Sequence, residues 1–418
     1  MVHVYVHVEK ISVDAFQAFA ALQADYTDQF VYAKKDEPYR FFGLGRCIAV
    51  DDPRDVHMCY EDVTVDVPRV HMFRFQRFDE QNGHVHDVLH SIFPHLNFLI
   101  PEIVVYEDEA GVFLQVNSLG PVNPVRVRRF IEKIDAYCMP PVGSLCIEVE
   151  QGDRNDFRDV VYRGLEHIRQ GRLKKIVLSR RKAVRVVGSF SSVDVVRALF
   201  DSSLKGTVVM YRYDDVFFVS CTPELLLSTQ GDNLESMCLA GSSFVGGGLL
   251  EDEKNRREHE YVVDFIRHTL QCRCINVDVP NEPSLLTLPH IEHLCTPVKA
   301  KMMEGVCGWD IAAYLHPTPA LAGTPVGEAI VAIRDIENFD RGFFGGIAGI
   351  VRYTDDVLHA DQIETHFSVT IRSGVFDSSK GYVYAGCGIV EGSDADAEYV
   401  ETENKMGTIL SIFDMSKS

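Results

Sequence analysis

The chain has 418 residues, of which 46% are hydrophobic and 24% are charged. This balance is typical of a folded globular protein and excludes disorder, collagen and a coiled coil as descriptions of the whole chain. Lys and Arg number 41 and Asp and Glu 61, so the net charge is −20. Because clustered cations bind phosphates and anionic lipids, we expect neither nucleic acid nor a membrane as the main partner.

The start of the chain and the cysteines predict a cytoplasmic protein. Residues 1–10 alternate Val with His, Tyr and Glu, which is typical of a strand and not of a signal peptide. No apolar run approaches the ~20 residues that span a bilayer. The 11 cysteines are scattered and form no CxxC pair, so we expect reduced thiols.

The patterns in residues 1–150 predict few elements. One helix is expected over residues 13–23, where apolar residues recur at helical spacing. Strands are expected over residues 2–8, 41–50, 103–106 and 112–116. The role of this N-terminal part does not follow from these patterns.

Residues 151–418 carry sharper patterns. Helices are expected over residues 156–170, which Gly171 would cap, over 192–200, with Ser192 as N-cap, and over 251–271 and 395–413. Strands are expected over residues 175–180, within 208–227, around 368–372 and over 382–385. Without repeats, linkers or regular βαβ alternation, residues 1–418 are predicted to form a single α+β domain with large, mostly antiparallel sheets.

Two of these helices carry carboxylates. Glu258 stands on the polar side of the long helix, and Glu398 and Glu401 share a face of the last helix, one turn before Lys405. Carboxylates from two helices suit Mg²⁺, which keeps several waters and takes few protein ligands. Glu and Lys at helical spacing also form ordinary solvated faces, so spacing alone leaves both interpretations open.

Three further segments carry polar groups with more than one interpretation. Glu224 follows Pro223 between expected strands. Gly386 and Gly388 precede the carboxylate helix, where glycines either form a turn or let backbone N–H groups approach an anion. Arg372, at an expected strand end, either binds a carboxylate or forms a surface ion pair.

Nine segments in this order resemble the chorismate-utilising enzymes, a family that includes isochorismate, salicylate, anthranilate and aminodeoxychorismate synthases. The resemblance spans residues 154–413. It implies sheets packed face to face with helices outside, and chorismate as substrate. The segments are KIVLSR, TPELLL, LAGS, KNRREHEYVVDFI, HLCTPVKAKM, LHPTPALAGTP, RGFFGGIAG, FSVTIRSG and AGCGIVEGSDADAEYVETENK.

The resemblance implies a bound Mg²⁺. Glu258 and Glu401 match the metal ligands of the family, and Glu398 matches a carboxylate that helps to hold a metal-bound water. Asn255 departs from the pattern, because relatives often have Asp or Glu there. This departure bears on the charge of the outer metal shell.

The resemblance also implies a substrate site. Arg372 matches the arginine that binds the enolpyruvyl carboxylate, and Lys405 matches the cation near the ring carboxylate. His293 matches an active-site histidine. Backbone donors for substrate carboxylates are expected at Gly241, Ser242, Gly386 and Gly388.

Two residues set the expected chemistry. Lys175 occupies the position that is Lys in members that add water and Gln in ammonia-using anthranilate synthases, so no glutamine amidotransferase subunit is expected. In its neutral form Lys175 would act as the base. Glu224 would protonate the C4 hydroxyl as it departs, which requires a pKa raised by burial or by like charge.

The pocket residues favour isochorismate as the product. Salicylate and anthranilate synthases resemble one another in having Thr at the position of Ala320, and salicylate synthases have Tyr at that of Phe344. With Leu321, these residues imply an apolar pocket that does not orient pyruvate elimination. A salicylate synthase and a catalytically inactive binding relative are the alternatives. Menaquinone, siderophore and salicylate synthesis are all open as destinations of the product.

Overall fold

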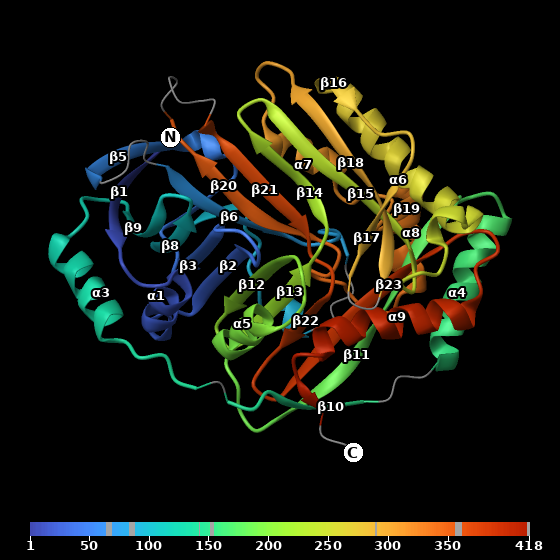
Figure 1. Ribbon diagram of the computed structural model, residues 1–418, viewed down its shortest axis with the longest axis horizontal. Coiled ribbons are helices and arrows are strands. Elements are labelled where there is room, and N and C mark those ends of the chain that lie inside the picture. Colours follow the sequence, from blue (N-terminus) through green and yellow to red (C-terminus); the bar gives the residue numbers. More distant parts are fainter. Residues whose placement is uncertain are drawn as a thin grey trace.

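Two large β-sheets face one another in the computed structural model, with helices on their outer surfaces (Figure 1). The structure describes residues 1–63, 69–82, 88–141, 143–150, 154–288, 291–355 and 362–415. Within these residues no helix is both long and apolar enough to cross a bilayer. The α+β architecture with mostly antiparallel sheets is as predicted.

The larger sheet has 14 strands in the described residues, and its neighbours are antiparallel except for the pairs β24/β10 and β1/β5. Strand β19 (Gly323–Thr324) joins it by pairing with β11. The order of the others is β24 (Asp414–Met415), β10 (Cys146–Val149), β11 (Lys175–Val187), β23 (Lys380–Ile389), β22 (Ser373–Phe376), β13 (Val216–Thr222), β12 (Thr207–Tyr213), β2 (Asp28–Lys34), β3 (Arg40–Leu44), β8 (Ile103–Asp108), β9 (Gly111–Ser118), β1 (Val2–Ile11) and β5 (Val56–Val63).

The second sheet has 10 strands in the described residues. Strand β17 (Ser284–Thr287) joins it by pairing with β18. The order of the others is β16 (Cys274–Asp278), β18 (Glu292–Met302), β15 (Asn233–Ser243), β14 (Leu225–Gln230), β21 (Glu364–Val369), β20 (Ile347–Tyr353), β6 (Val70–Gln76), β7 (Phe98–Ile100) and β4 (Ile48–Val50).

Helices cover the outer surfaces of both sheets (Figure 1). The α-helices are α1 (Ala15–Leu22), α2 (Val88–Ser91), α3 (Pro124–Ala136), α4 (Arg154–Arg169), α5 (Ser192–Asp201), α6 (Glu253–Gln271), α7 (Gly308–Leu315), α8 (Val326–Ile336) and α9 (Ala395–Leu410). Short 3₁₀ turns are η1 (Gln23–Asp25), η2 (Pro53–Asp55) and η3 (Leu249–Glu251).

The alternation of strand β2 separates two apolar cores. Phe30 and Tyr32 face the space between the sheets, where the Phe30 ring lies 5.6 Å from that of Phe73 on β6. Val31 and Ala33 point the other way, into a core shared with α1, α3, α5 and α9. The larger sheet is therefore buried on both faces near its middle, which explains the continuous apolar runs of its strands.

Several expected elements are confirmed. Most ends of the expected helices and strands lie within about two residues of the observed ends, as for α1, α4, α6, β1, β8, β9 and β23. Strand β11 begins as expected at residue 175 but continues beyond residue 180. Gly171 follows α4 with a φ of +70°, as its predicted capping position requires. The last helix ends at Leu410 instead of residue 413.

Three local predictions were wrong. Residues 41–50 form two strands in different sheets, because Gly45 takes a φ of +66° between β3 and β4. Residues 368–372 are not one strand, since β21 ends at Val369 and Arg372, with a φ of +53°, precedes β22. Helix α5 is capped by Ser191, one residue earlier than expected, through a reciprocal capping box with Asp194.

Candidate active site

A pocket lies where β11, β15, β23, α6 and α9 come together. Most of the residues that the resemblance assigned to the site line it, although they come from distant parts of the chain. These are Glu224, Gly241, Ser242, Glu258, His293, Ala320, Leu321, Phe344, Arg372, Gly386, Gly388, Glu401 and Lys405. Lys175 and Glu398 do not line it, and both are buried.

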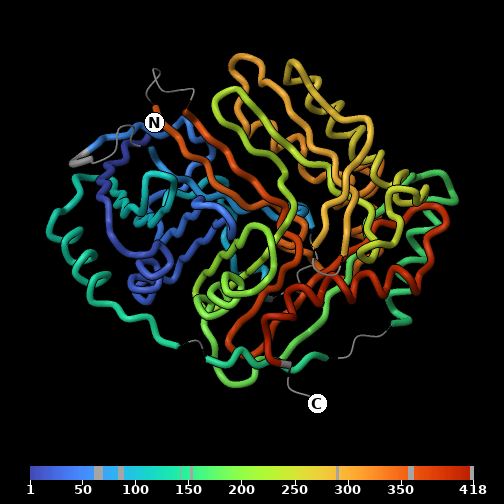
Figure 2. Tube along the Cα trace, viewed as in Figure 1, coloured from blue at the N-terminus to red at the C-terminus, as the bar shows by residue number. Residues whose placement is uncertain are grey.

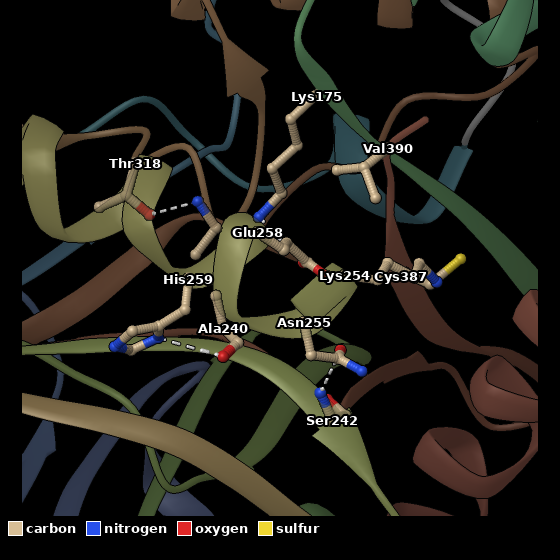
Figure 3. Close-up of polar contacts among 12 residues, drawn as sticks. Lys175, Ala240, Ser242, Lys254, Asn255, Glu258, His259, Thr318, Cys387 and Val390 are labelled. Atoms are coloured by element: carbon tan, nitrogen blue, oxygen red, sulfur yellow. Dashed lines mark hydrogen bonds and ion pairs between the residues drawn. The ribbon is translucent and has the colours of Figure 1, made fainter. Parts of the chain in front are cut away.

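Lys175 and Glu258 form a buried ion pair. Lys175 begins β11 and is fully buried, and its Nζ lies 3.0 Å from Oε1 of Glu258 on α6 (Figure 3). A Cβ at Gly388, on the adjacent strand β23, would lie 2.0 Å from the same Oε1 and 3.0 Å from Lys175 Cε. Only glycine leaves room there for both side chains. Glu258 is thus buried and not part of a solvated helix face.

His259 holds α6 against the second sheet. Its Nδ1 lies 3.2 Å from the Ala240 carbonyl oxygen on β15 (Figure 3). Its Nε2 lies 2.8 Å from Thr296 Oγ1 on β18. Burial lowers the pKa of His259 to about 4, so the ring is neutral. Nδ1–H donates to Ala240 and Nε2 accepts from Thr296, which fixes the rotation of the helix that carries Glu258.

Glu224 follows β13 and is buried beside the pocket. Burial raises its pKa from 4.5 to about 7, although the cations Lys175, Arg372 and Lys405 act in the opposite direction. A carboxyl group with this pKa is protonated in a large share of molecules at neutral pH. Such a group is able to donate a proton, and the role of Glu224 as the acid stays a prediction.

Arg372, His293 and Ser242 form a hydrogen-bonded chain along the pocket. Arg372 donates from a guanidinium nitrogen to His293 Nε2 at 2.9 Å. His293 must then carry its proton on Nδ1, which lies 2.9 Å from Ser242 Oγ. Burial and the charges of Arg372 and Lys405 hold the pKa of His293 well below its usual range. His293 is neutral and both of its ring nitrogens are engaged, so it orients Arg372.

Gly241 produces a local irregularity in β15. It has a φ of +78°, and the register with β18 shifts between Ala240 and Ser242. The Ser242 N–H, expected as a donor to substrate, donates instead to Asn255 Oδ1 at 3.2 Å (Figure 3). Asn255 thus contacts the backbone of the LAGS segment.

Three lysines neutralise the three acidic residues of the expected metal site. Besides the Lys175–Glu258 pair, Lys254 Nζ lies 2.7 Å from Glu398 Oε1 and Lys405 Nζ lies 2.5 Å from Glu401 Oε1. Burial, and next the charge of Glu401, raise the pKa of Glu398. Burial raises the pKa of the Cys387 thiol well above its usual range, and the charges of all three glutamates add to this effect.

This grouping fits a divalent cation. Glu258 and Glu401 line the pocket from two helices, and Glu398 is buried on α9, one turn before Glu401. Carboxylate oxygens are the donors that Mg²⁺ prefers. The absent Cβ of Gly388 keeps the approach to Glu258 open.

Two polar residues of the pocket were missed from the sequence. Arg341 is buried and donates to Glu337 at 2.5 Å, to the Leu321 carbonyl at 2.9 Å and to the Val177 carbonyl at 2.8 Å. Tyr384 stacks on Phe344 with ring centroids 5.4 Å apart. Arg341 begins the quoted RGFFGGIAG segment, and its i, i+4 spacing from Glu337 was a signal for this pair. The missed apolar lining is Val177, Leu239, Ala240, Ile371, Ala385 and Cys387.

A family model described as chorismate binding enzyme matches residues 1–414. The chain belongs to this family. Isochorismate synthase MenF of Bacillus subtilis (strain 168) is 30% identical over 332 residues, which are 75% of this chain and 69% of that protein. Isochorismate synthase EntC of Escherichia coli (strain K12) is 31% identical over 276 residues, 62% of this chain and 68% of that protein.

The fold of this chain is similar to that of MenF, the menaquinone-specific isochorismate synthase from Escherichia coli, with a TM-score of 0.79 and 21% sequence identity. The match covers 98% of this chain and 95% of that one. Anthranilate synthase component I from Streptococcus pneumoniae matches with a TM-score of 0.67 and 20% identity, over 91% of this chain and 92% of that one. The fold of this chain is thus similar both to that of a protein named as an isochorismate synthase and to that of one named as an anthranilate synthase component.

Proposed function

We propose that the protein is an isochorismate synthase, which converts chorismate to isochorismate. The observation that carries the proposal is the grouping of four side chains at one pocket. Lys175 is buried beside it, the Glu224 carboxyl group has a pKa of about 7, and Arg372 and Lys405 line it. A base, an acid and two cations are the groups that the isomerisation of a dianionic substrate needs. The 30–31% identity to two isochorismate synthases supports the same reaction.

In the proposed reaction, a water oxygen forms a bond to C2 of the ring. Lys175 takes the proton that this water loses. It acts in its neutral form, so the protein reacts in the state in which Lys175 has given up the proton of its ion pair with Glu258. The ring double bonds shift and the bond from C4 to its hydroxyl breaks. Glu224 donates a proton to the departing oxygen, so that one water is consumed and one is released. A proton returned from Lys175 to Glu224 through solvent restores the starting state.

The cations of the pocket bind the substrate carboxylates in this proposal. Arg372 is buried and oriented by His293, which suits it to the enolpyruvyl carboxylate. Glu258 and Glu401, supported by Glu398, would hold Mg²⁺. When bound, Mg²⁺ would neutralise the ring carboxylate and orient the substrate.

Ala320, Leu321 and Phe344 give this pocket an apolar side, which favours release of isochorismate. A salicylate synthase would continue with pyruvate elimination, and an inactive relative would bind chorismate unchanged. We also propose a cytoplasmic location, which the eleven free thiols support. With Lys175 at the base position, no amidotransferase partner is expected.

Product analysis tests the proposal. Purified protein is incubated with chorismate and MgCl₂, with and without excess chelator, and the products are separated by chromatography. Isochorismate is expected only with the metal, without pyruvate or fluorescent salicylate. Stoichiometric pyruvate and salicylate would identify a salicylate synthase, and full activity in chelator would refute the metal assignment. Lys175→Ala is expected to lose 10²–10⁴-fold in turnover, roughly the effect of removing a general base.

A further inference from the structure

A group of metal-ligating side chains lies on the edge of the larger sheet, in strands β1 and β5 at the N-terminal end of the molecule (Figure 1). The two strands pair in parallel, with His3 opposite His57 and Tyr5 opposite Cys59. Residues two apart in a strand point to the same face, so His57 and Cys59 lie side by side. His3 projects from the neighbouring strand onto that face. Each of the three offers one ligand atom, and these atoms lie within 4.8 Å of one another.

The distances suit a tetrahedral ion. His3 Nδ1 lies 3.7 Å from Cys59 Sγ. With bonds of about 2.05 Å to nitrogen and 2.3 Å to sulfur at the tetrahedral angle, zinc would separate those two atoms by about 3.6 Å. The His3 and His57 rings are 5.0 Å apart and nearly perpendicular, at 84°.

A carboxylate orients the second histidine. His57 Nδ1 lies 2.6 Å from Asp355 Oδ2, and the same oxygen accepts the Met58 N–H at 3.0 Å. A histidine whose Nδ1–H donates to a carboxylate presents the lone pair of Nε2 outward, which is the usual arrangement behind a zinc-bound imidazole. Asp355 follows β20 of the other sheet, so that both sheets support this group.

We propose that His3, His57 and Cys59 bind a Zn²⁺ ion, with water as the fourth ligand. Imidazole and thiolate donors select zinc over Mg²⁺, which requires oxygen ligands, so this site and the carboxylates of the pocket bind different ions. On binding, the thiol of Cys59 releases its proton to solvent and the sulfur forms the metal bond. Both histidines are exposed, which gives the ion direct access. The ion would link the edge strand β5 to β1.

Cobalt substitution tests the proposal without relying on activity. Metal-free protein, with no affinity tag and with its thiols reduced, is titrated with CoCl₂ in saturating MgCl₂ and separately with ZnCl₂ in a calorimeter. A thiolate-to-cobalt charge-transfer band is expected in the near ultraviolet, with one equivalent bound, and Zn²⁺ should abolish the band. Carboxylates of the pocket cannot produce this band, because it requires sulfur coordination.

Matched variants separate this site from other thiols and histidines. Cys59→Ser and His3→Ala are expected to lose the band and to weaken Zn²⁺ binding by more than the ~10–100-fold expected for Asp355→Asn. Cys272→Ser and His268→Ala alter exposed residues on α6 or just after it and should bind as the native protein does. Turnover of chorismate should be unchanged in all five variants. Absence of the band in the native protein, or its persistence in Cys59→Ser, would overturn the proposal.

Discussion

Glu224 carries the property on which the proposed reaction most depends. Burial raises its pKa from 4.5 to about 7, so the protonated form is lost as the pH rises above neutrality. We predict that kcat/KM falls along an alkaline limb that begins near pH 7. Glu224→Gln cannot donate a proton and is expected to lose roughly 10²–10⁴-fold in kcat/KM, without that limb. Rate profiles between pH 5 and 9 measure both effects; an unchanged limb in the variant would assign it to another residue.

The same residue links stability to pH. Between about pH 4.5 and pH 7 the folded protein keeps the Glu224 proton while the unfolded chain releases it. The free energy of unfolding therefore falls as the pH rises through this window. Glu224→Gln has no such proton, so its free energy of unfolding does not fall in this way. The difference between the free energies of unfolding of the variant and the native protein should therefore shift in favour of the variant by roughly 3 kcal/mol from pH 4 to pH 8. Urea unfolding at several pH values measures the difference, with the exposed Glu235→Gln as a control that should show no such trend.

At the scale of elements, the site depends on how closely α6 approaches β23. Gly388 leaves the space into which Glu258 extends, since a Cβ would lie 2.0 Å from Glu258 Oε1. We predict that Gly388→Ala displaces this carboxylate, lowers kcat/KM by about 10²-fold and raises the Mg²⁺ concentration needed for activity, consistent with misplacement of a catalytic group by about 1 Å. Circular dichroism should show an intact fold.

Gly407→Ala is the matched control for that substitution. Gly407 lies in α9, which also carries Glu401, and nothing lies within 4 Å of an added Cβ there. Alanine should stabilise the helix by about 0.5–1 kcal/mol and leave kcat/KM within about twofold. Equal losses in both variants would show that the effect of Gly388→Ala does not arise from contact with Glu258.

Each sheet combines strands from residues 1–150 with strands from residues 151–418. Strands β2 and β6 come from residues 1–150 and pair with β12 and β20 of residues 151–418. Figure 2 shows residues 1–150, from blue to teal, beside the green and orange strands with which they pair. We therefore propose that residues 1–418 form a single domain, as the sequence analysis expected, in which the first 150 residues complete the sheets.

Truncation tests this proposal. A fragment of residues 151–418 would expose two apolar strand edges where β2 and β6 are missing, although it carries every candidate catalytic residue. Exposed edges of this kind favour aggregation. We predict that the fragment is insoluble or lacks cooperative unfolding, as measured by sedimentation and thermal melting beside the full chain. A soluble fragment with a sharp melt and native turnover would contradict the single-domain proposal.

Local patterns determined much of this protein. Helices such as α4 and α6 were predictable because their apolar periodicity and caps involve residues a few positions apart. Most of the pocket lining could be named because the motifs that resemble the family fall on fixed positions. Boundaries were missed where a positive φ bends the chain, as at Gly45 and Arg372. Such a bend reflects contacts made by the surrounding structure.

Only the tertiary structure decided which side chains meet. Lys175 and Glu258 lie in different elements, 83 positions apart, and their 3.0 Å contact depends on β11, β23 and α6 packing together. The neutral state of His293 and the raised pKa of Glu224 arise from burial, which no short sequence segment specifies. Burial and long-range charge depend on the whole fold, whereas capping and periodicity depend on neighbouring residues; this difference separates what the sequence determined from what the structure decided.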